Sequence, residues 1–203
     1  MKPEYIRHSE IEKDKWDECV THSINHLPYC YSWYLDIVSP GWDALMLGNY
    51  DFIFPLTHRK KGGINYLYQP YFTQQLGLFA KMDFDEALLT IFLQSIPSKF
   101  KFIEINLNTN CLLNAKEKMI TKRRTHHLNL FDSYENISRN FNENTRRNLK
   151  KAATEKFIVV QNGEPEKIIE LFKNSTGAKT DLKTSDYKML AALMKKLIEK
   201  KNK

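Results

Sequence analysis

Four segments between residues 125 and 161 decide how the fold of this chain is interpreted: His126-His127-Leu128-Asn129-Leu130, Asp132-Ser133-Tyr134-Glu135, Asn144-Thr145-Arg146-Arg147-Asn148-Leu149-Lys150-Lys151-Ala152 and Phe157-Ile158-Val159-Val160. Their pattern predicts a strand, a helix and a second strand. Asp132, with Glu135 three residues later, is a capping-box-like start in which side chains satisfy free backbone amides.

The predicted helix has an apolar face and a basic face. Its apolar-face residues recur at spacings of three and four, which at about 100° per residue places them on one side: Tyr134, Ile137, Phe141, Thr145, Leu149 and Ala152. Arg139, Arg146 and Lys150 then lie on the opposite face, with Arg147 and Lys151 along its flank. The predicted helix therefore carries a basic stripe on the face opposite its apolar residues.

Two interpretations of the basic stripe stay open. It is either the solvated face of a basic protein or a binding site for phosphate or carboxylate, because the planar guanidinium group of arginine can donate two hydrogen bonds to such an anion. The asparagines Asn140, Asn142 and Asn144 are poor helix formers and good caps, so we expect a kink or a helix restart near Asn144. If Asn144 caps the restarted helix, its free amides point toward the same anion.

Composition indicates a globular protein with an anionic partner. The 203 residues are 42% apolar, enough for one large domain or two small ones, and the net charge is +7. This charge favours nucleic acid, a nucleotide or sugar-phosphate, or an anionic membrane surface. Three cysteines without pairing or metal spacing, a charged N-terminus and no long apolar stretch indicate a soluble, cytoplasmic protein.

The first half of the chain alternates between helical and strand periodicity. We expect strands at 5–8, 42–47, 52–57, 64–68 and a buried one at 102–106, and helices at 11–21, 32–38 and 83–96. The three central strands form an antiparallel meander, in which Pro55 indicates an edge or a bulge. His22 and His26 lie four residues apart, but Asn25 and Pro28 indicate a loop there and no acidic partner follows. No metal site is therefore expected.

Two regions resemble a known family. The strand, the Ser-Tyr-Glu helix start and the segment 144–152 resemble the opening of the second domain of FemAB-like (Fem aminoacyltransferase) proteins, which consist of two tandem GNAT acyltransferase folds. The first half resembles the N-terminal domain of a Bacteroidetes subgroup of these proteins in four segments: Trp33-Tyr34-Leu35-Asp36, Gly41-Trp42-Asp43-Ala44-Leu45, Tyr66-Leu67-Tyr68-Gln69-Pro70 and Phe72-Thr73-Gln74-Gln75-Leu76-Gly77.

The resemblance implies an α+β fold with a GNAT-like first domain at residues 1–120 and a partial second GNAT-like domain at 121–203. The second domain has its first elements, followed by helices at 165–174 and 185–201, and lacks the expected sheet centre and phosphate-binding loop. The resemblance thus implies a fragment of a longer protein or a shortened homologue. The apolar face of the last helix (Tyr187, Leu190, Leu193, Met194 and Leu197) should mediate a homo-oligomer or fold back on the first domain.

One departure from the family pattern concerns the cofactor. GNAT enzymes that use acetyl-CoA place Gln/Arg-x-x-Gly-x-Gly/Ala between a strand and a helix, so that bare amides approach the pyrophosphate. The nearest match here is Gln74-Gln75-Leu76-Gly77-Leu78-Phe79, in which the Phe79 ring would crowd a phosphate. We therefore interpret this stretch as a strand end that lines a cleft or merely packs.

Two functions follow as hypotheses. The first is FemAB-like N-acyl transfer to an amine, with acyl-CoA or aminoacyl-tRNA as co-substrate and without a covalent enzyme intermediate, because no Ser-His-Asp or Cys-His arrangement is present. The second is a non-catalytic module that binds an anionic small molecule, tRNA or another nucleic acid. For either, the substrate-binding residues expected are Arg146, Arg147 and Lys150 on one wall and Tyr68, Gln69, Tyr71, Gln74 and Gln75 on the other.

Overall fold

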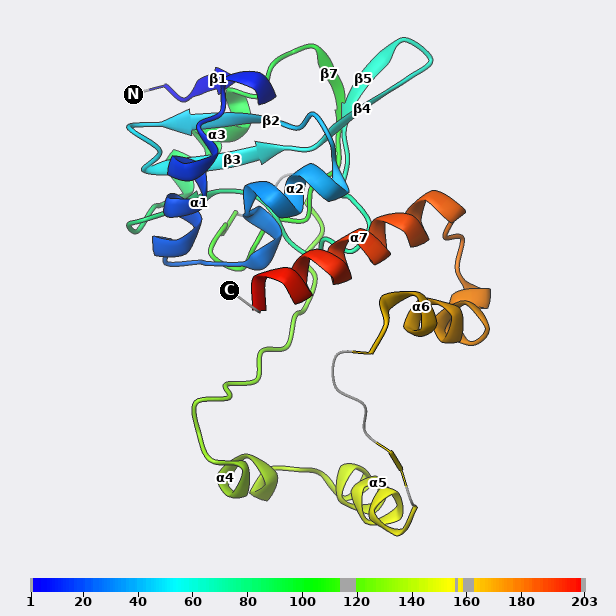
Figure 1. The fold of residues 1–203 in the computed structure, drawn as a ribbon. Coiled ribbons are helices and arrows are strands. Elements are labelled where there is room, and N and C mark those ends of the chain that lie inside the picture. The colour runs from blue at the N-terminus through cyan, green and yellow to red at the C-terminus, as the bar shows by residue number, and fades with distance from the viewer. Residues whose placement is uncertain (1, 114–119, 156, 159–162, 202–203) are drawn as a thin grey trace. The chain divides into compact units, whose positions relative to one another are not determined.

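The computed structural model describes residues 2–113, 120–155, 157–158 and 163–201, and it has the predicted α+β character (Figure 1). Its contacts divide the chain into two compact units: residues 1–113 with 164–203 form unit 1, and residues 114–163 form unit 2. This grouping differs from the division at residue 120 expected from the sequence, because residues 164–203 pack with the first part of the chain.

Unit 1 is built around two sheets. The first has the order β1-β2-β3-β6 with antiparallel neighbours, from Glu4–Ile6, Asp43–Leu47, Phe52–Leu56 and Phe79–Ala80. The second has the order β4-β5-β7, from His58–Lys61, Ile64–Leu67 and Phe100–Ile103. Within it, β4 and β5 form an antiparallel hairpin, whereas β5 and β7 are parallel. The expected single meander is therefore wrong: the chain passes from one sheet to the other at Thr57, and β4 was not predicted.

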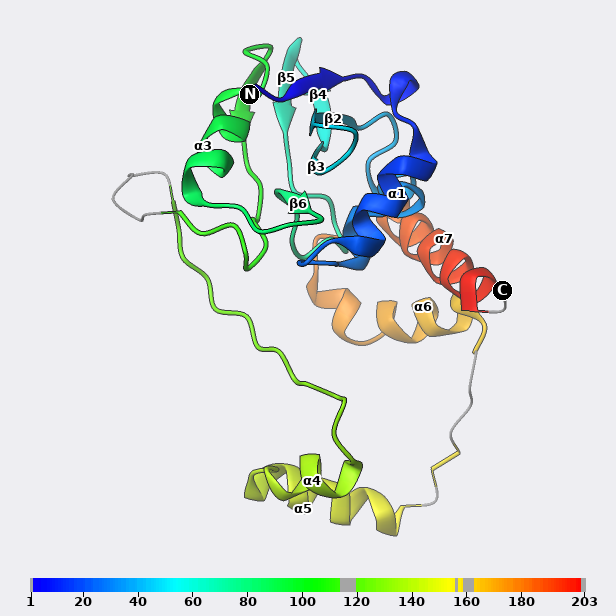
Figure 2. The ribbon, with the colours of Figure 1, turned by 90° about the vertical axis from the view of Figure 1, so that its left-hand side faces the viewer.

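The helices of unit 1 are α1 (Lys13–His22), α2 (Ser32–Val38), α3 (Glu86–Gln94), α6 (Pro165–Lys173) and α7 (Thr184–Lys201). Short 3-10 turns lie at His8–Glu10, Pro28–Cys30 and Thr176–Lys179. Figure 2 shows α1 and α3 on opposite sides of the strands of the first sheet. Both helices therefore cover the sheet and bury its two faces.

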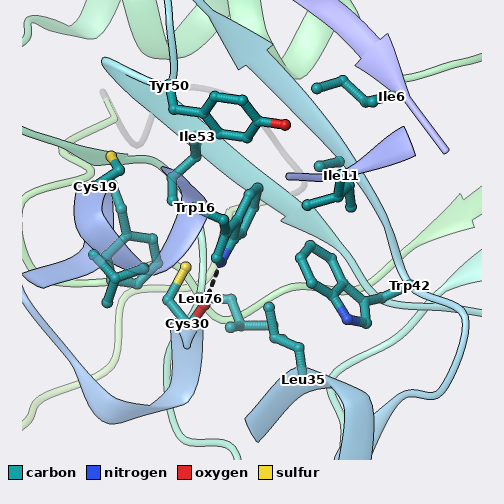
Figure 3. Packing of buried hydrophobic residues seen from close by; sticks show 13 residues of the cluster. Ile6, Ile11, Trp16, Cys19, Cys30, Leu35, Trp42, Tyr50, Ile53 and Leu76 are labelled. Carbon is teal, nitrogen blue, oxygen red and sulfur yellow. Dashed lines mark hydrogen bonds between the residues drawn. The ribbon is translucent and has the colours of Figure 1, made fainter. Parts of the chain in front are cut away.

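Alternation along β2 and β3 produces two hydrophobic cores. Ala44 and Ile53 face the core formed with α1 and α2, while Leu45 and Phe54 face the core formed with α3. In the first core, Trp16 is fully buried and its indole N–H donates to the Cys30 carbonyl oxygen at 2.6 Å (Figure 3). Side chains with a period of two thus bury both faces of one sheet.

Pro55 lies in β3, which has neighbours on both sides only at its start. The short β6 pairs with Phe52 and Ile53 alone, so β2 is the neighbour of β3 at Pro55. A missing amide is tolerated where one side of a strand is free of a partner. The predicted edge position is confirmed for this part of the strand.

The last helix folds back on unit 1. Leu193 of α7 is buried against Tyr34 and Val38 of α2, with Met189 beside them. Of the two outcomes expected for the apolar face of this helix, folding back is the one observed. Leu197, at the far end of that face, remains 49% exposed.

The prediction of a buried strand at 102–106 is wrong in both extent and burial. The strand β7 covers Phe100–Ile103 at the end of its sheet, and only Phe100 is buried. Phe102 and Ile103 are exposed, and β7 is an edge strand whose one neighbour among the described residues is β5.

Unit 2 contains the helices α4 (Tyr134–Arg139) and α5 (Glu143–Thr154), so the single predicted helix is interrupted. The caps differ from the predicted ones: the Ser133 hydroxyl accepts from the Asn136 amide, and the Asn142 side chain accepts from the Thr145 amide at 2.8 Å. Asp132 and Asn144 are therefore not the caps, although the restart itself was predicted.

The strand predicted at 126–130 is not observed, and the strand predicted at 157–160 lies only partly within the described residues. Residues 126–130 form neither helix nor strand, and all five are exposed. Phe157 and Ile158 are likewise exposed and outside any strand, while residues 159 and 160 lie outside the described residues. An alternating pattern predicts a strand only where a neighbouring strand completes its hydrogen bonds.

Candidate functional site

The first group of predicted site residues follows the carboxyl end of the parallel strands β5 and β7. Leu67 and Ile103 pair at the ends of these strands, and the Glu104 amide donates to the Leu67 carbonyl oxygen at 3.2 Å. Tyr68 and Gln69 come directly after β5. The carboxyl ends of parallel strands are a common position for ligand sites, because the loops that leave them lie together at one edge.

Tyr68 and Gln69 make contacts that hold this loop in place. The Tyr68 hydroxyl donates to the Val38 carbonyl oxygen at 3.2 Å, and the Arg59 guanidinium lies 4.1 Å from the centre of the Tyr68 ring. Gln69 donates through Nε2 to the Thr73 carbonyl oxygen at 2.8 Å and accepts from the Asn106 amide at 2.9 Å. Both ends of the Gln69 amide are therefore engaged within the protein.

The other three residues of this group differ in their exposure. Tyr71 and Gln74 are exposed and available to a ligand. Gln75 is 9% exposed, and its Oε1 is buried without a hydrogen-bond partner among the described residues. A buried amide oxygen without a partner is unfavourable. Gln75 is thus the residue of this loop whose polar side chain the protein itself does not satisfy.

The segment that most resembles a phosphate-binding loop is packed instead. The Leu76 amide donates to the Asn106 carbonyl oxygen at 2.7 Å, and the Leu78 amide lies 3.4 Å from the Cys111 sulfur. Gly77 has φ +104°, and a Cβ there would lie 3.0 Å from both the Cys111 sulfur and the Leu107 side chain. The glycine therefore permits close packing, and the segment does not fit the pyrophosphate of acyl-CoA.

The second group of predicted site residues lies on α5 in unit 2. One Nη atom of Arg146 donates to the Arg139 carbonyl oxygen at 2.6 Å, and one of Arg147 donates to Asn144 Oδ1 at 2.8 Å. Within the described parts of the chain, Arg146, Arg147 and Lys150 form no ion pair with a carboxylate. Each guanidinium carries five N–H donors, so both retain donors for an anion.

Positive charge is concentrated in unit 2. Residues 114–163 contain eleven Lys and Arg against five Asp and Glu, a net charge of +6, whereas the whole chain carries +7. Unit 1 is therefore almost neutral. The predicted site thus divides into an aromatic and amide group in unit 1 and a cationic group in unit 2.

A charged cluster in unit 1 surrounds Asp43, and no spacing pattern in the sequence indicates it. Asp43 Oδ2 accepts from the Tyr5 hydroxyl and lies 3.1 Å from His58 Nε2 and 3.4 Å from Lys99 Nζ. Asp43 Oδ1 accepts from the His8 amide at 3.1 Å. Four segments that are distant in sequence therefore meet at one carboxylate.

Opposing effects act on the ionisation of this cluster. Burial alone would raise the pKa of Asp43, but the adjacent His58 imidazole and the hydrogen bonds from Tyr5 and the His8 amide hold it well below its usual range. Burial and the bond to Asp43 raise the pKa of Tyr5 well above its ordinary value. Asp43 is thus a charged anchor with satisfied oxygens. Its one signal in the sequence is a carboxylate at an otherwise buried strand position.

The cluster offers a carboxylate and an imidazole, but none of its contacts involves a Ser or Cys nucleophile. Across the described ranges, no group of three or more His, Cys, Asp or Glu side chains is arranged to hold a metal ion. None of the helices in those ranges is long and apolar enough to cross a bilayer.

No family model, curated protein or solved structure matches this chain.

Proposed function

We propose that this protein binds a phosphate-bearing ligand through α5 and the basic residues of unit 2. The observation that carries this proposal is the unbalanced charge of residues 114–163, which hold eleven cationic and five anionic side chains. Arg146, Arg147 and Lys150 present donors and positive charge without carboxylate partners in the described residues. Such groups bind phosphate because hydrogen bonds between charged partners are about twice as strong as neutral ones.

The test compares two double variants of the full chain that remove the same charge. Arg146→Gln/Arg147→Gln alters α5, while Lys60→Gln/Lys61→Gln alters exposed residues of the β4-β5 hairpin in unit 1. Inorganic pyrophosphate is the probe, titrated while the amide signals of α5 are followed by NMR. The α5 variant should lose about 1.5 to 3 kcal/mol of binding free energy per charged hydrogen bond, and the hairpin variant should bind like the wild type.

Folding must be preserved for this comparison to hold. Exposed charges contribute about 0 to 1 kcal/mol to stability, so both variants should melt close to the wild type. Equal pyrophosphate affinity in all three proteins would contradict the proposal. Failure of the α5 variant to fold would make the two arginines structural and would also contradict it.

The second candidate is FemAB-like N-acyl transfer to an amine, and the order of elements in unit 1 favours it. Helices, antiparallel strands, α3 and then β7 follow each other along the chain in the order that the resemblance implies, although the strands form two sheets. Tyr71, Gln74 and Gln75 would then contact the acceptor, which must be presented as a neutral amine. Because the segment 74–79 does not fit acyl-CoA, we expect aminoacyl-tRNA and not acetyl-CoA to raise the melting temperature.

A further inference from the structure

We infer that the partner of unit 2 is the surface of an anionic phospholipid bilayer. This inference rests on the proposed function, because it names the ligand class of the same basic residues. In this arrangement α5 lies against lipid phosphates, and neighbouring apolar side chains enter the boundary between headgroups and acyl chains. Two features of unit 2 carry it: apolar side chains that the protein leaves uncovered, and cations placed next to them.

Among the described residues, Phe131 and Ile158 of unit 2 are more exposed than any large apolar side chain of unit 1. Phe131 is 100% and Ile158 is 89% exposed, and Leu128, Leu130 and Phe157 are exposed by 68%, 73% and 70%. We call these five residues the apolar tract. Neither α4 nor α5 has a buried residue, so the described part of unit 2 provides no core to cover the tract. Uncovered apolar surface of this kind marks a contact with another molecule or a membrane.

Cationic residues precede both parts of the apolar tract in the sequence. Lys122, Arg123 and Arg124 shortly precede Leu128, and Lys150 and Lys151 on α5 precede Phe157. Segments that combine basic and large apolar residues bind in the plane of anionic membranes, since the charges meet phosphates while the apolar groups leave water. The charge of unit 2 is therefore complementary to an anionic bilayer, and its apolar tract matches the layer below the phosphates.

The chemistry of the apolar tract favours lipid over nucleic acid. Single-stranded nucleic acids are bound by basic grooves with aromatic rings on which bases stack. Leu128, Leu130 and Ile158 have no aromatic face to offer a base, yet they are among the most exposed large apolar residues of the unit. In a bilayer, aliphatic and aromatic side chains both contribute in proportion to the apolar area they bury.

The experiment measures co-sedimentation of the full chain with vesicles of phosphatidylcholine alone and with added phosphatidylglycerol. We expect binding only when phosphatidylglycerol is present. Each basic residue near an anionic surface contributes about fivefold to binding, so Arg146→Gln/Arg147→Gln should weaken it on the order of 30-fold. The matched control, Lys60→Gln/Lys61→Gln, removes two charges from unit 1 and should bind the vesicles like the wild type.

A third variant separates this inference from the proposed function. Leu128→Ser/Leu130→Ser/Phe131→Ser removes exposed side chains and keeps every charge, so it should fold, lose vesicle binding and still bind pyrophosphate. Undiminished vesicle binding by this variant would overturn the bilayer and leave pyrophosphate binding intact. Tighter binding to single-stranded RNA than to the vesicles would also overturn it and make nucleic acid the partner. Absence of pyrophosphate binding in the wild type would overturn the proposed function itself.

Discussion

The two units of this protein form helices for different reasons. In unit 1, α1 is held by a core in which Trp16, Cys19 and Val20 are fully buried. In unit 2, α4 and α5 bury no residue and begin at side-chain caps from Ser133 and Asn142. Short helices are marginal in water without tertiary packing. Burial in a core therefore stabilises the helices of unit 1, whereas the described helices of unit 2 have side-chain caps and no buried residue.

The same contrast holds for charge. In unit 1 the buried carboxylate of Asp43 accepts from the Tyr5 hydroxyl and the His8 amide, lies 3.1 Å from His58 Nε2 and joins segments of both sheets. In unit 2 the cations of α5 donate to a backbone oxygen and an amide oxygen and leave further donors free. Charge is thus structural in unit 1 and available for binding in unit 2.

The largest expected effect tests this contrast by truncating one apolar residue in each unit. Trp16→Ala removes a fully buried indole and its hydrogen bond to Cys30, so unit 1 should lose about 3 to 5 kcal/mol of unfolding free energy. Leu149→Ala on α5 removes a side chain that is 45% exposed, and the loss should stay within about 0.5 kcal/mol. Urea unfolding of the full chain measures both, with circular dichroism following the helices of the two units and tryptophan fluorescence following unit 1, where all three tryptophans lie.

A comparable loss of stability in the two variants would break the comparison. It would mean that Leu149 is covered in solution, so that unit 2 has a core of its own. Cys111→Ser is a useful third substitution, because Cys111 is buried beside Gly77 and its change should again affect unit 1 alone.

Much of unit 1 could be predicted because its periodicity and its burial agree. The helix expected at 32–38 matches α2, and the strands at 42–47 and 52–57 match β2 and β3 to within one residue. The break between the two sheets at Thr57 was missed, since β4 consists of His58, Arg59, Lys60 and Lys61 and has no apolar pattern. Its pairing with β5 comes from backbone hydrogen bonds, which leave little trace in composition.

Unit 2 shows the opposite result. The predicted strand at 126–130 was wrong because alternation of Leu128 and Leu130 signals a strand only when a sheet is there to receive it. The helix restart was predicted because an asparagine side chain caps a helix through backbone amides only a few residues away.

Of the candidate site residues, the basic stripe was visible in the sequence, whereas the Asp43 cluster was not. Its members lie up to 94 residues apart, as Tyr5 and Lys99 show, and no spacing rule joins them.

A second, smaller effect concerns acid stability and belongs to unit 1. The pKa of Asp43 is lower in the folded protein than in the unfolded chain, where an aspartate has a pKa of about 3.9. Its contribution is therefore complete above that pH and is lost as the pH falls toward the folded-state pKa. Asp43→Asn should reduce stability at neutral pH by about 1.5 to 3 kcal/mol, the value of a hydrogen bond to a charged group.

The pH dependence distinguishes this anchor from an ordinary carboxylate. Below about pH 4, the unfolding free energy of the wild type should fall more steeply than that of Asp43→Asn. Asp83→Asn is the matched control, since Asp83 is exposed, and it should leave both the stability and its slope unchanged. Parallel curves for the wild type and Asp43→Asn would show that Asp43 is not a charged anchor.

The smallest effect sharpens the comparison within unit 2, where caps replace a core. Asn142 Oδ1 accepts from the Thr145 amide at 2.8 Å and starts α5, while Asn144 Oδ1 accepts from the Arg147 side chain. Replacing a capping asparagine with alanine costs about 1 kcal/mol, and no buried contact compensates in α5. Asn142→Ala should therefore lower the helicity of residues 143–154 and speed hydrogen exchange at the Thr145 amide.

Asn144→Ala, a matched change two residues later, should affect neither, since position 144 is already helical. NMR hydrogen exchange on the full chain resolves these amides, and the unfolding midpoint of unit 1 should stay constant in both variants. A larger effect at Asn144 than at Asn142 would move the start of α5 to the position that the sequence first indicated, and would shift the free amides of the helix toward Arg147.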